Sequence, residues 1–413
     1  MRTYVNKTQI FLLCFTAFVL PLYIKATSIS MVLLLILAFV TKENRKQIVL
    51  LFKDYKYYIF ILPLIVAAFG LFIGNYYNER FQTIVIFSSL LFFPIIFKTF
   101  SINNFRRRLL WINTWFIIGL LTAFIICFFT SLSEYLHTED TSVFFYTRLT
   151  HLIMLPNQLS IYVLWGIFIL LFDLTNSKKQ LVFFNSTIAK IIIVIVLVTF
   201  LFLMASKAAF LIFCLSIIAM FGIMIKRRTI PIWQSILLII ALLIPSYYLF
   251  NNTNIKARMI VAYNHIFKKE DIKYGSSEST VLRMAALNAS IKLIKDNFFT
   301  GVGTGNVKKA LISQYQKDEV PSNYKLQTNP HNQFIYSLTM NGIAGFLALI
   351  GIFIVMFVIA YKQKSDIIFI WGLITMLFFM SDDLLMLQVG IIFFTFFSSI
   401  LLWGAYKKQD SIK

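Results

Sequence analysis

Long apolar runs, each ending in a cluster of charged residues, recur throughout this 413-residue chain. The runs are 15 to 25 residues long, which is the length of α-helix that crosses the hydrocarbon core of a bilayer. The short alternating segments of a membrane barrel are absent from the sequence. Only 13% of the residues are charged, whereas a soluble domain carries about 25%. The sequence therefore predicts an all-α polytopic membrane protein, with residues 1–413 forming a single integral membrane domain.

The apolar runs predict about 12 transmembrane helices. These helices are expected near residues 8–24, 27–41, 58–74, 80–98, 109–132, 157–174, 188–204, 207–225, 230–250, 332–360, 367–381 and 387–405. With a cytoplasmic N-terminus, the cytoplasmic segments hold 21 Lys and Arg residues and the short outer loops hold four. Because positive residues gather on the cytoplasmic side, both termini are expected there. The net charge of +21 then reflects membrane topology, and no nucleic-acid partner is expected.

One polar insertion, residues 251–330, interrupts the pattern on the predicted outer face. It holds 12 Lys and Arg and 6 Asp and Glu residues, and a loop of this length usually has a function. Residues 279–296 have apolar side chains at helical spacing, and residues 307–317 form a second candidate helix. The glycine-rich sequence GVGTGN, residues 301–306, predicts a tight turn between them. The insertion is thus expected to be a large, partly helical loop.

The chain holds only four histidines, and one of them lies at a predicted helix mouth. His331 follows Pro330, whose ring biases the preceding residue away from helix, so a helix should begin near Asn332. A neutral imidazole there, with an ordinary pKa of about 6.5, can take a proton from a hydroxyl group. On chemistry alone, the alternative is a histidine that merely sits at the membrane interface.

The residues after His331 have a specific spacing. His331 and Asn332, nine further residues, Gly342, two residues and Gly345 form an HN-x9-GxxG pattern. This pattern resembles the signature of bacterial O-antigen ligases and the related O-antigen polymerases, in which it opens the helix after a long periplasmic loop. The resemblance extends to the number of spans, the position of the loop and the turn at 301–306. It implies a GT-C-like membrane glycosyltransferase with a catalytic His331, while the two glycines are expected to allow close packing.

The resemblance also implies cationic residues that bind a lipid-linked donor. Arg283 matches the arginine that the family carries upstream of the glycine-rich turn, and its guanidinium suits a pyrophosphate. Arg258 is a weaker competitor for this role. The second family arginine follows a serine at a helix mouth, where this chain has Ser206 and Lys207, so the charge is kept but the planar fork is lost. Asp382 matches a lone acid of some relatives and could orient His331 or a cation.

The implied activity is that of an O-antigen ligase in the bacterial cytoplasmic (inner) membrane, with its active site facing the periplasm. It would transfer glycan from undecaprenyl pyrophosphate to a hydroxyl of the lipid A core, with inversion and with neither metal nor cofactor. A polymerase that joins lipid-linked repeat units is the alternative within the class, and a lipid-linked-glycan flippase or transporter is the alternative outside it. The expected catalytic residue is His331, and the expected substrate-binding residues are Arg283, Lys207, Asn332 and Asp382. Weaker candidates on the outer face are His137, Arg148, His151 and His265.

Overall fold

The computed structural model describes residues 2–73, 77–99, 105–175, 180–227, 279–320 and 329–404. Every regular element in these segments is a helix, so the predicted all-α fold is confirmed for them. The first helices are α1 (Arg2–Val19), α2 (Ile24–Val40), α3 (Lys42–Leu51), α4 (Tyr55–Gly70), α5 (Tyr77–Phe87), α6 (Ser89–Thr99) and α7 (Phe105–Thr138). They are followed by η1 (Thr141–Phe144), α8 (Tyr146–Thr150), α9 (Pro156–Thr175), α10 (Thr187–Leu203) and α11 (Lys207–Lys226).

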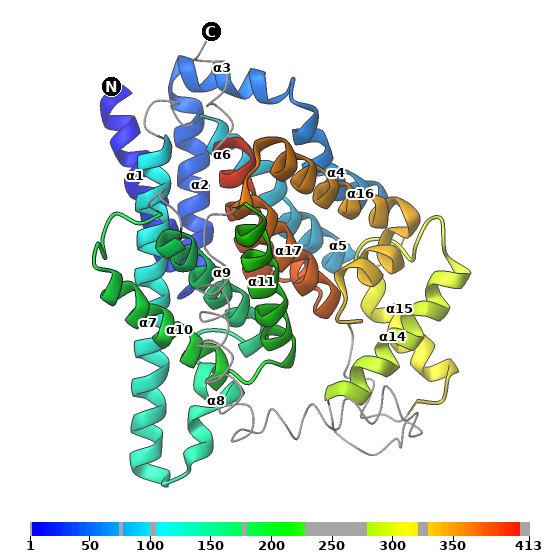
Figure 1. The fold of residues 1–413 in the computed structure, drawn as a ribbon. Coiled ribbons are helices and arrows are strands. Elements are labelled where there is room, and N and C mark those ends of the chain that lie inside the picture. The colour runs from blue at the N-terminus through cyan, green and yellow to red at the C-terminus, as the bar shows by residue number, and fades with distance from the viewer. Residues whose placement is uncertain are drawn as a thin grey trace.

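The carboxyl-terminal part contains the two helices predicted in the long insertion. Its elements are α14 (Ser279–Asp296), α15 (Val307–Lys317), α16 (Gln333–Gln363), α17 (Asp366–Ser381), η3 (Leu384–Met386), α18 (Gln388–Ser399) and η4 (Ile400–Gly404). The bounds of α14 and α15 are those expected from the sequence. Figure 1 shows α8, α14 and α15 at one end of the molecule, opposite the end where α1 begins and where α3 lies. We call the end with α8, α14 and α15 the outer end.

Five described helices are long and apolar enough to cross a membrane, and the number is six if the bent pair α2 and α3 counts as one span. Further apolar helices of 10 to 17 residues pack among them. A polytopic membrane protein is thus supported. The predicted span at 230–250 lies outside the described residues.

The centre of the bundle is aromatic. Almost the whole of α9 is buried, as expected for a helix that is apolar on all sides. Trp165 of α9 meets Trp371 of α17 with ring centroids 4.7 Å apart, and Tyr162 stacks on Phe393 of α18 at 4.0 Å. These contacts pack α9, α17 and α18 together, so the ends of the connection between α17 and α18 are held in place by the bundle.

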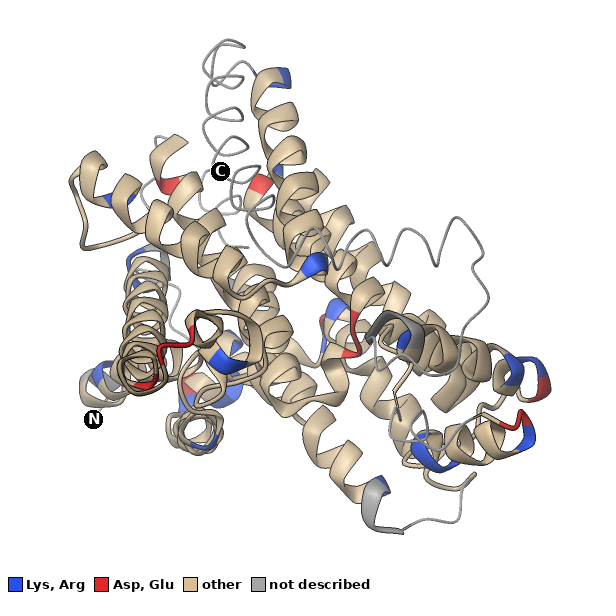
Figure 2. Ribbon diagram, turned by 90° about the horizontal axis from the view of Figure 1, so that it is seen from below, with Lys and Arg blue, Asp and Glu red and all other residues tan. Residues whose placement is uncertain are grey.

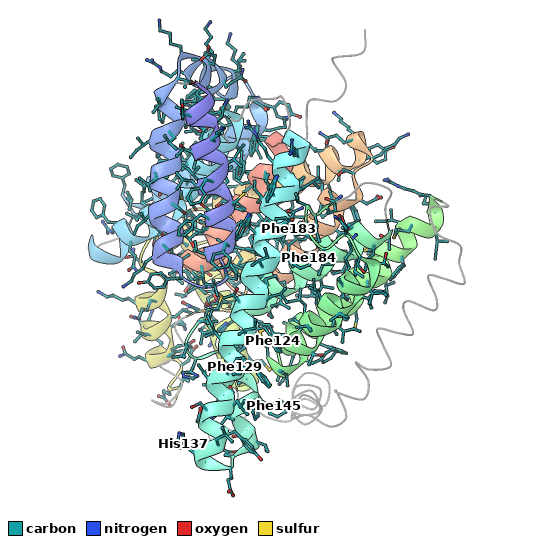
Figure 3. The ribbon with its side chains drawn as sticks, turned by 90° about the vertical axis from the view of Figure 1, so that its left-hand side faces the viewer. Phe124, Phe129, His137, Phe145, Phe183 and Phe184 are labelled. Atoms are coloured by element: carbon teal, nitrogen blue, oxygen red, sulfur yellow. The ribbon has the colours of Figure 1, made fainter. Side chains whose placement is uncertain are left out.

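α7 lies at the side of the bundle and extends to its outer end. Figure 3 shows Phe124, Phe129 and His137 in succession along this helix, with His137 closest to the outer end. His137 is exposed there. This weaker candidate therefore lies on a solvated helix extension.

α16 has a break at Asn341 and Gly342. Gly342 has φ 61° and ψ −157°, outside the helical region. A Cβ at this position would lie 2.3 Å from the carbonyl oxygen of Phe299, so the site requires glycine both for its backbone angle and for space. At Gly345 a Cβ would lie 2.6 Å from the carbonyl oxygen of Ser337. Both glycines thus allow a close approach of backbone, Gly342 to the segment after α14 and Gly345 to an earlier turn of α16 itself.

The glycine-rich turn docks at this break. The N–H groups of Val302 and Gly303 donate to the carbonyls of Thr339 and Met340 at 2.9 and 2.8 Å. The break interrupts the helical hydrogen bonding, so these two carbonyls are available to the turn. The turn also reaches α4, because the N–H of Thr304 donates to the carbonyl of Gly70 at 3.1 Å. The insertion is thereby fixed to α4 and α16, which sets the position of α14.

Candidate active site

His331 lies at the start of α16, as predicted. The side chain of Asn332 caps this helix by accepting hydrogen bonds from the N–H groups of Phe334 and Ile335 at 3.0 and 3.1 Å. The same side chain donates from Nδ2 to the carbonyl of Met380 at 3.1 Å, which ties α16 to the end of α17. His331 itself has φ 49°, a left-handed conformation that side chains other than glycine adopt at a cost. Such strain is typical of functional positions.

The imidazole of His331 is held by a carboxylate. Its Nδ1 lies 3.0 Å from Oδ1 of Asp382 and 3.9 Å from Oδ1 of Asp383. Both acids lie in the connection between α17 and α18 and are buried, with 8% and 1% of their surfaces exposed. The N–H of Asp383 also donates to Oδ1 of Asp382 at 3.0 Å. The structure thus brings Asp382 to His331, one of the two arrangements that the sequence suggested.

The two acids have opposite shifts of pKa. Burial raises the pKa of both carboxyl groups, but in Asp382 the hydrogen bonds with His331 and Asp383, together with the charge of Arg283, outweigh burial and lower the pKa below its ordinary value. In Asp383 burial and the neighbouring Asp382 carboxylate together raise the pKa well above its ordinary value. The negative charge of the pair is therefore favoured on Asp382, the acid that faces the imidazole.

Gln333 was not predicted as a site residue from the sequence, yet it also binds the connection between α17 and α18. Its side chain is fully buried, and Oε1 accepts a hydrogen bond from the N–H of Leu385 at 2.8 Å. Three consecutive side chains, His331, Asn332 and Gln333, therefore hold the end of α17 and the connection that follows it. The sequence signal was a glutamine in an apolar helix directly after the His-Asn pair.

Arg283 lies near the acid pair. It projects from the first turns of α14, and its Nη1 donates to the carbonyl of Ser381 at a long 3.5 Å. Its positive charge lowers the pKa of both Asp382 and Asp383. This long bond leaves most of the five N–H donors of the guanidinium for other partners. Figure 2, seen from the outer end, shows basic and acidic segments near the centre of the molecule.

Lys207 begins α11 at the same end of the bundle. Ser206 caps this helix, and its hydroxyl donates to Oδ1 of Asn157 at 2.9 Å. At the other end of α11, Arg227 pairs with Asp366 of α17 at 2.8 Å, so the two helices run antiparallel. Lys207 therefore lies at the end of the bundle where α17 finishes.

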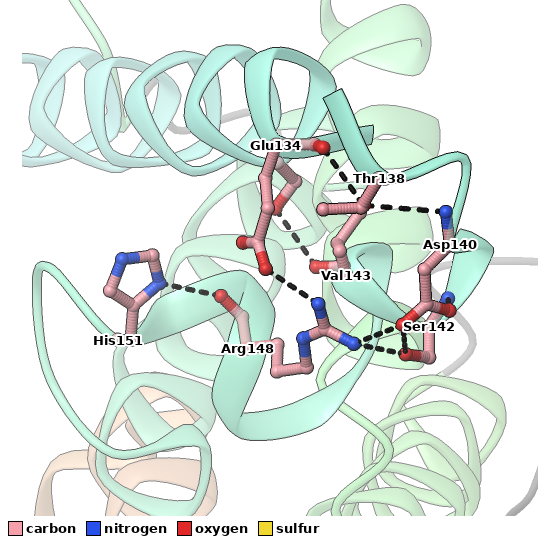
Figure 4. Close-up of polar contacts among 8 residues, drawn as sticks. Glu134, Thr138, Asp140, Ser142, Val143, Arg148 and His151 are labelled. Atoms are coloured by element: carbon pink, nitrogen blue, oxygen red, sulfur yellow. Dashed lines mark hydrogen bonds and ion pairs between the residues drawn. The ribbon is translucent and has the colours of Figure 1, made fainter. Parts of the chain in front are cut away.

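Two of the weaker candidates, Arg148 and His151, form a different cluster. Arg148 pairs with Glu134 at 2.5 Å and with Asp140, and it donates to the hydroxyl of Ser142 (Figure 4). Nδ1 of His151 lies 2.6 Å from the carbonyl of Arg148. These contacts brace the turn after α7 and give no sign of an open site. Arg258 and His265 lie outside the described residues.

Among the described residues, one group could hold a metal ion: His331, Asp382 and Asp383, whose ligand atoms lie within 4.8 Å of one another. Two observations disfavour this use. Nδ1 of His331 is already engaged with Asp382, and the positive charge of Arg283 acts on both acids. The geometry fits a hydrogen-bonded His-Asp pair better than a cation site.

The comparison with known families bears on this same region. Residues 192–350 match the model of a family described as O-antigen ligase. The match confirms the resemblance to the O-antigen ligase and polymerase superfamily. This superfamily implies a glycosyltransferase-like membrane enzyme that acts on lipid-linked glycans. No curated protein matches the chain in sequence.

The O-antigen ligase match spans four of the five predicted site residues. Lys207, Arg283, His331 and Asn332 fall within it, whereas Asp382 follows its end. Asp382 therefore lies outside the matched segment, and its hydrogen bond connects it to His331 inside that segment.

Proposed function

We propose that this protein is an O-antigen ligase that transfers glycan from undecaprenyl pyrophosphate to a hydroxyl of the lipid A core. The observation that carries this proposal is the hydrogen bond between the half-buried His331 and the buried Asp382 beside Arg283, within or next to the segment that matches the family. A hydroxyl-activating base beside a cation is what glycosyl transfer from a diphosphate requires.

The proposed topology has 12 transmembrane helices in the cytoplasmic (inner) membrane of a bacterium. Both termini are cytoplasmic, and residues 251–330 form a large periplasmic loop. The excess of Lys and Arg on the predicted cytoplasmic segments supports this orientation. The outer end with His331 then faces the periplasm, where a donor must arrive already activated because nucleotide sugars stay in the cytoplasm.

Arg283 and Lys207 bind the donor pyrophosphate in this mechanism. Arginine offers a planar fork to phosphate oxygens and lysine a compact charge. The long contact of Arg283 with the carbonyl of Ser381 leaves that fork able to turn toward a ligand. Asn332 caps α16 and holds its first turn against α17, which keeps the mouth of the site in place for the substrate.

His331 acts as the general base. When Nδ1–H donates to the Asp382 carboxylate, Nε2 is the ring nitrogen that can accept the proton of the acceptor hydroxyl. The hydroxyl oxygen attacks the anomeric carbon in line as the bond to the diphosphate breaks, so the configuration inverts. Undecaprenyl diphosphate leaves with the electron pair, and the cations stabilise its charge without a metal ion. General base catalysis of this kind contributes about 10²- to 10⁴-fold.

The test is the glycan profile of a deletion strain that carries either the wild-type protein or His331→Ala. A ligase is supported if the variant lacks glycan on lipopolysaccharide while long chains accumulate on the lipid carrier. Single repeat units on the carrier would instead identify a polymerase. Unchanged profiles with correctly inserted protein would refute the role of His331 and favour a transporter.

A further inference from the structure

Arg80 is an outer-end cation that the mechanism above does not use. It lies in the first turn of α5 and begins the apolar segment Arg80–Thr99. It packs directly on the glycine-rich turn, because a Cβ on Gly305 would lie 2.7 Å from the backbone nitrogen of Arg80 and 2.9 Å from its Cγ. The turn that fixes α14, and with it Arg283, therefore also fixes Arg80.

The helix of Arg80 also touches the connection that holds His331. α5 packs against η3, which directly follows Asp383. The N–H of Leu385 within η3 donates to Gln333, two residues after His331. Arg80 and the His331–Asp382 pair are thus linked through one short segment of chain.

The guanidinium of Arg80 has an unsatisfied edge. Its Nε and Nη2 are inaccessible to solvent and have no hydrogen-bond partner among the described residues. These two nitrogens form one side of the planar group, the side that takes two oxygens of one phosphate or carboxylate in a bidentate contact. A buried charge without a partner costs several kcal/mol in general. Such a group persists where it serves a ligand.

The neighbouring side chain does not remove this need. Oδ1 of Asn306, next to Gly305, is also buried without a donor. A neutral amide could accept one or two of the five N–H bonds of a guanidinium, but it would leave the positive charge uncompensated. An anion satisfies both the donors and the charge.

We infer that Arg80 binds a phosphate oxygen of the lipid-linked donor, as a third cation beside Arg283 and Lys207. The inference rests on the proposed donor, a polyprenyl diphosphate. A diphosphate offers several oxygens that can be shared among cations, and Arg80 lies on α5, which packs against η3 in the same connection. The ligand class is therefore a diphosphate ester of a long isoprenoid alcohol.

The test measures the binding of farnesyl diphosphate, a short polyprenyl diphosphate, to the full chain in detergent by titration calorimetry. Loss of one charge-assisted bidentate contact should weaken binding about tenfold to a hundredfold in Arg80→Gln. Arg80→Lys keeps the charge but loses the fork, so an intermediate loss is expected. Lys308→Gln is the matched control, because it removes an exposed outer-end charge from α15 and should change binding less than about twofold.

A stability measurement separates ligand binding from a structural role. If the buried edge of the Arg80 guanidinium is a ligand-binding group, Arg80→Met should raise the melting temperature of the ligand-free protein. It should also abolish the stabilisation by farnesyl diphosphate. A lower melting temperature with unchanged binding in Arg80→Gln and Arg80→Lys would overturn the inference and leave the proposed function intact. If the wild type does not bind the probe at all, both this inference and the diphosphate donor fail.

Discussion

Two arginine clusters lie at the outer end of the molecule, and they differ in how fully their charges are satisfied. Arg148, after α7, meets Glu134, Asp140 and Ser142 and sits among exposed groups. Arg283, on α14, makes one long hydrogen bond with a carbonyl among the described residues, beside a buried acid pair of which Asp382 is bonded to His331. A saturated cluster braces a turn, whereas an unsaturated one can take an anionic ligand. The difference supports the proposal that the α14 side binds the donor.

The largest expected effect is at the acid that faces the imidazole. Asp382→Asn keeps the shape of the side chain but removes the negative charge that orients and supports His331. Transfer should fall about 10²-fold or more, within the range of general base catalysis. Initial rates with purified protein and lipid-linked donor measure this effect. A loss below threefold would mean that the hydrogen bond between His331 and Asp382 has no part in the chemistry.

The next largest effect is expected at Arg283, whose contact with a carbonyl is long. Arg283→Gln should raise the KM for the donor about tenfold to a hundredfold, because one charge-assisted contact with the pyrophosphate is lost. Arg283→Lys should recover part of the loss, since charge remains without the fork. An unchanged KM for the donor in Arg283→Gln, with folded protein, would remove the basis for contrasting the two arginines.

The pH dependence of stability should distinguish the two neighbouring acids. The pKa of Asp383 is raised in the folded protein, which therefore binds more protons than the unfolded chain above about pH 4. Stability should fall as the pH rises through the raised pKa, and Asp383→Asn should remove this slope. Melting temperatures from about pH 4 to pH 8 measure it. A slope that persists in Asp383→Asn would assign the titration to another group.

The smallest effect is expected in the saturated cluster. Arg148→Gln should leave transfer within about twofold of wild type, because exposed ion pairs contribute little. The backbone N–H of Ser142 and the contact with Arg148 lower the pKa of Asp140 to about 2. Any stability that Asp140 gains is therefore present above pH 4 and lost as the pH falls toward 2.

The melting temperatures of wild type and Arg148→Gln should differ slightly at neutral pH and converge in acid. A large loss of glycan transfer in Arg148→Gln at neutral pH would show that this cluster also belongs to the active site.

Local patterns in the sequence predicted much of this arrangement. The bounds of α14 and α15 followed from apolar spacing and from the glycine-rich turn, and the start of α16 followed from Pro330 and its capping asparagine. Contacts between segments far apart in the sequence were harder to predict. The pairing of Asp382 with His331 was one of two suggestions, because 51 residues separate the two positions.

Other features could not be read from the sequence at all. Adjacent acids at a membrane interface are usually solvated, so the burial of Asp383 and the raised pKa of its carboxyl group depend on how α17 and α18 pack. The sequence around Gln333 also did not indicate its hydrogen-bond partner, which is a backbone N–H in η3. The unsatisfied edge of Arg80 lies beside a contact between α5 and the glycine-rich turn, which joins residues more than 200 positions apart.

The most direct test of the central claim is a single-turnover assay with purified protein in lipid vesicles, given lipid-linked glycan, lipid A core and a metal chelator. Wild type should form the glycan–core product with inverted configuration. His331→Ala should bind the donor as tightly as wild type and form product at least about 10²-fold more slowly. Product formation by His331→Ala within about threefold of wild type would contradict the assignment of His331 as the base.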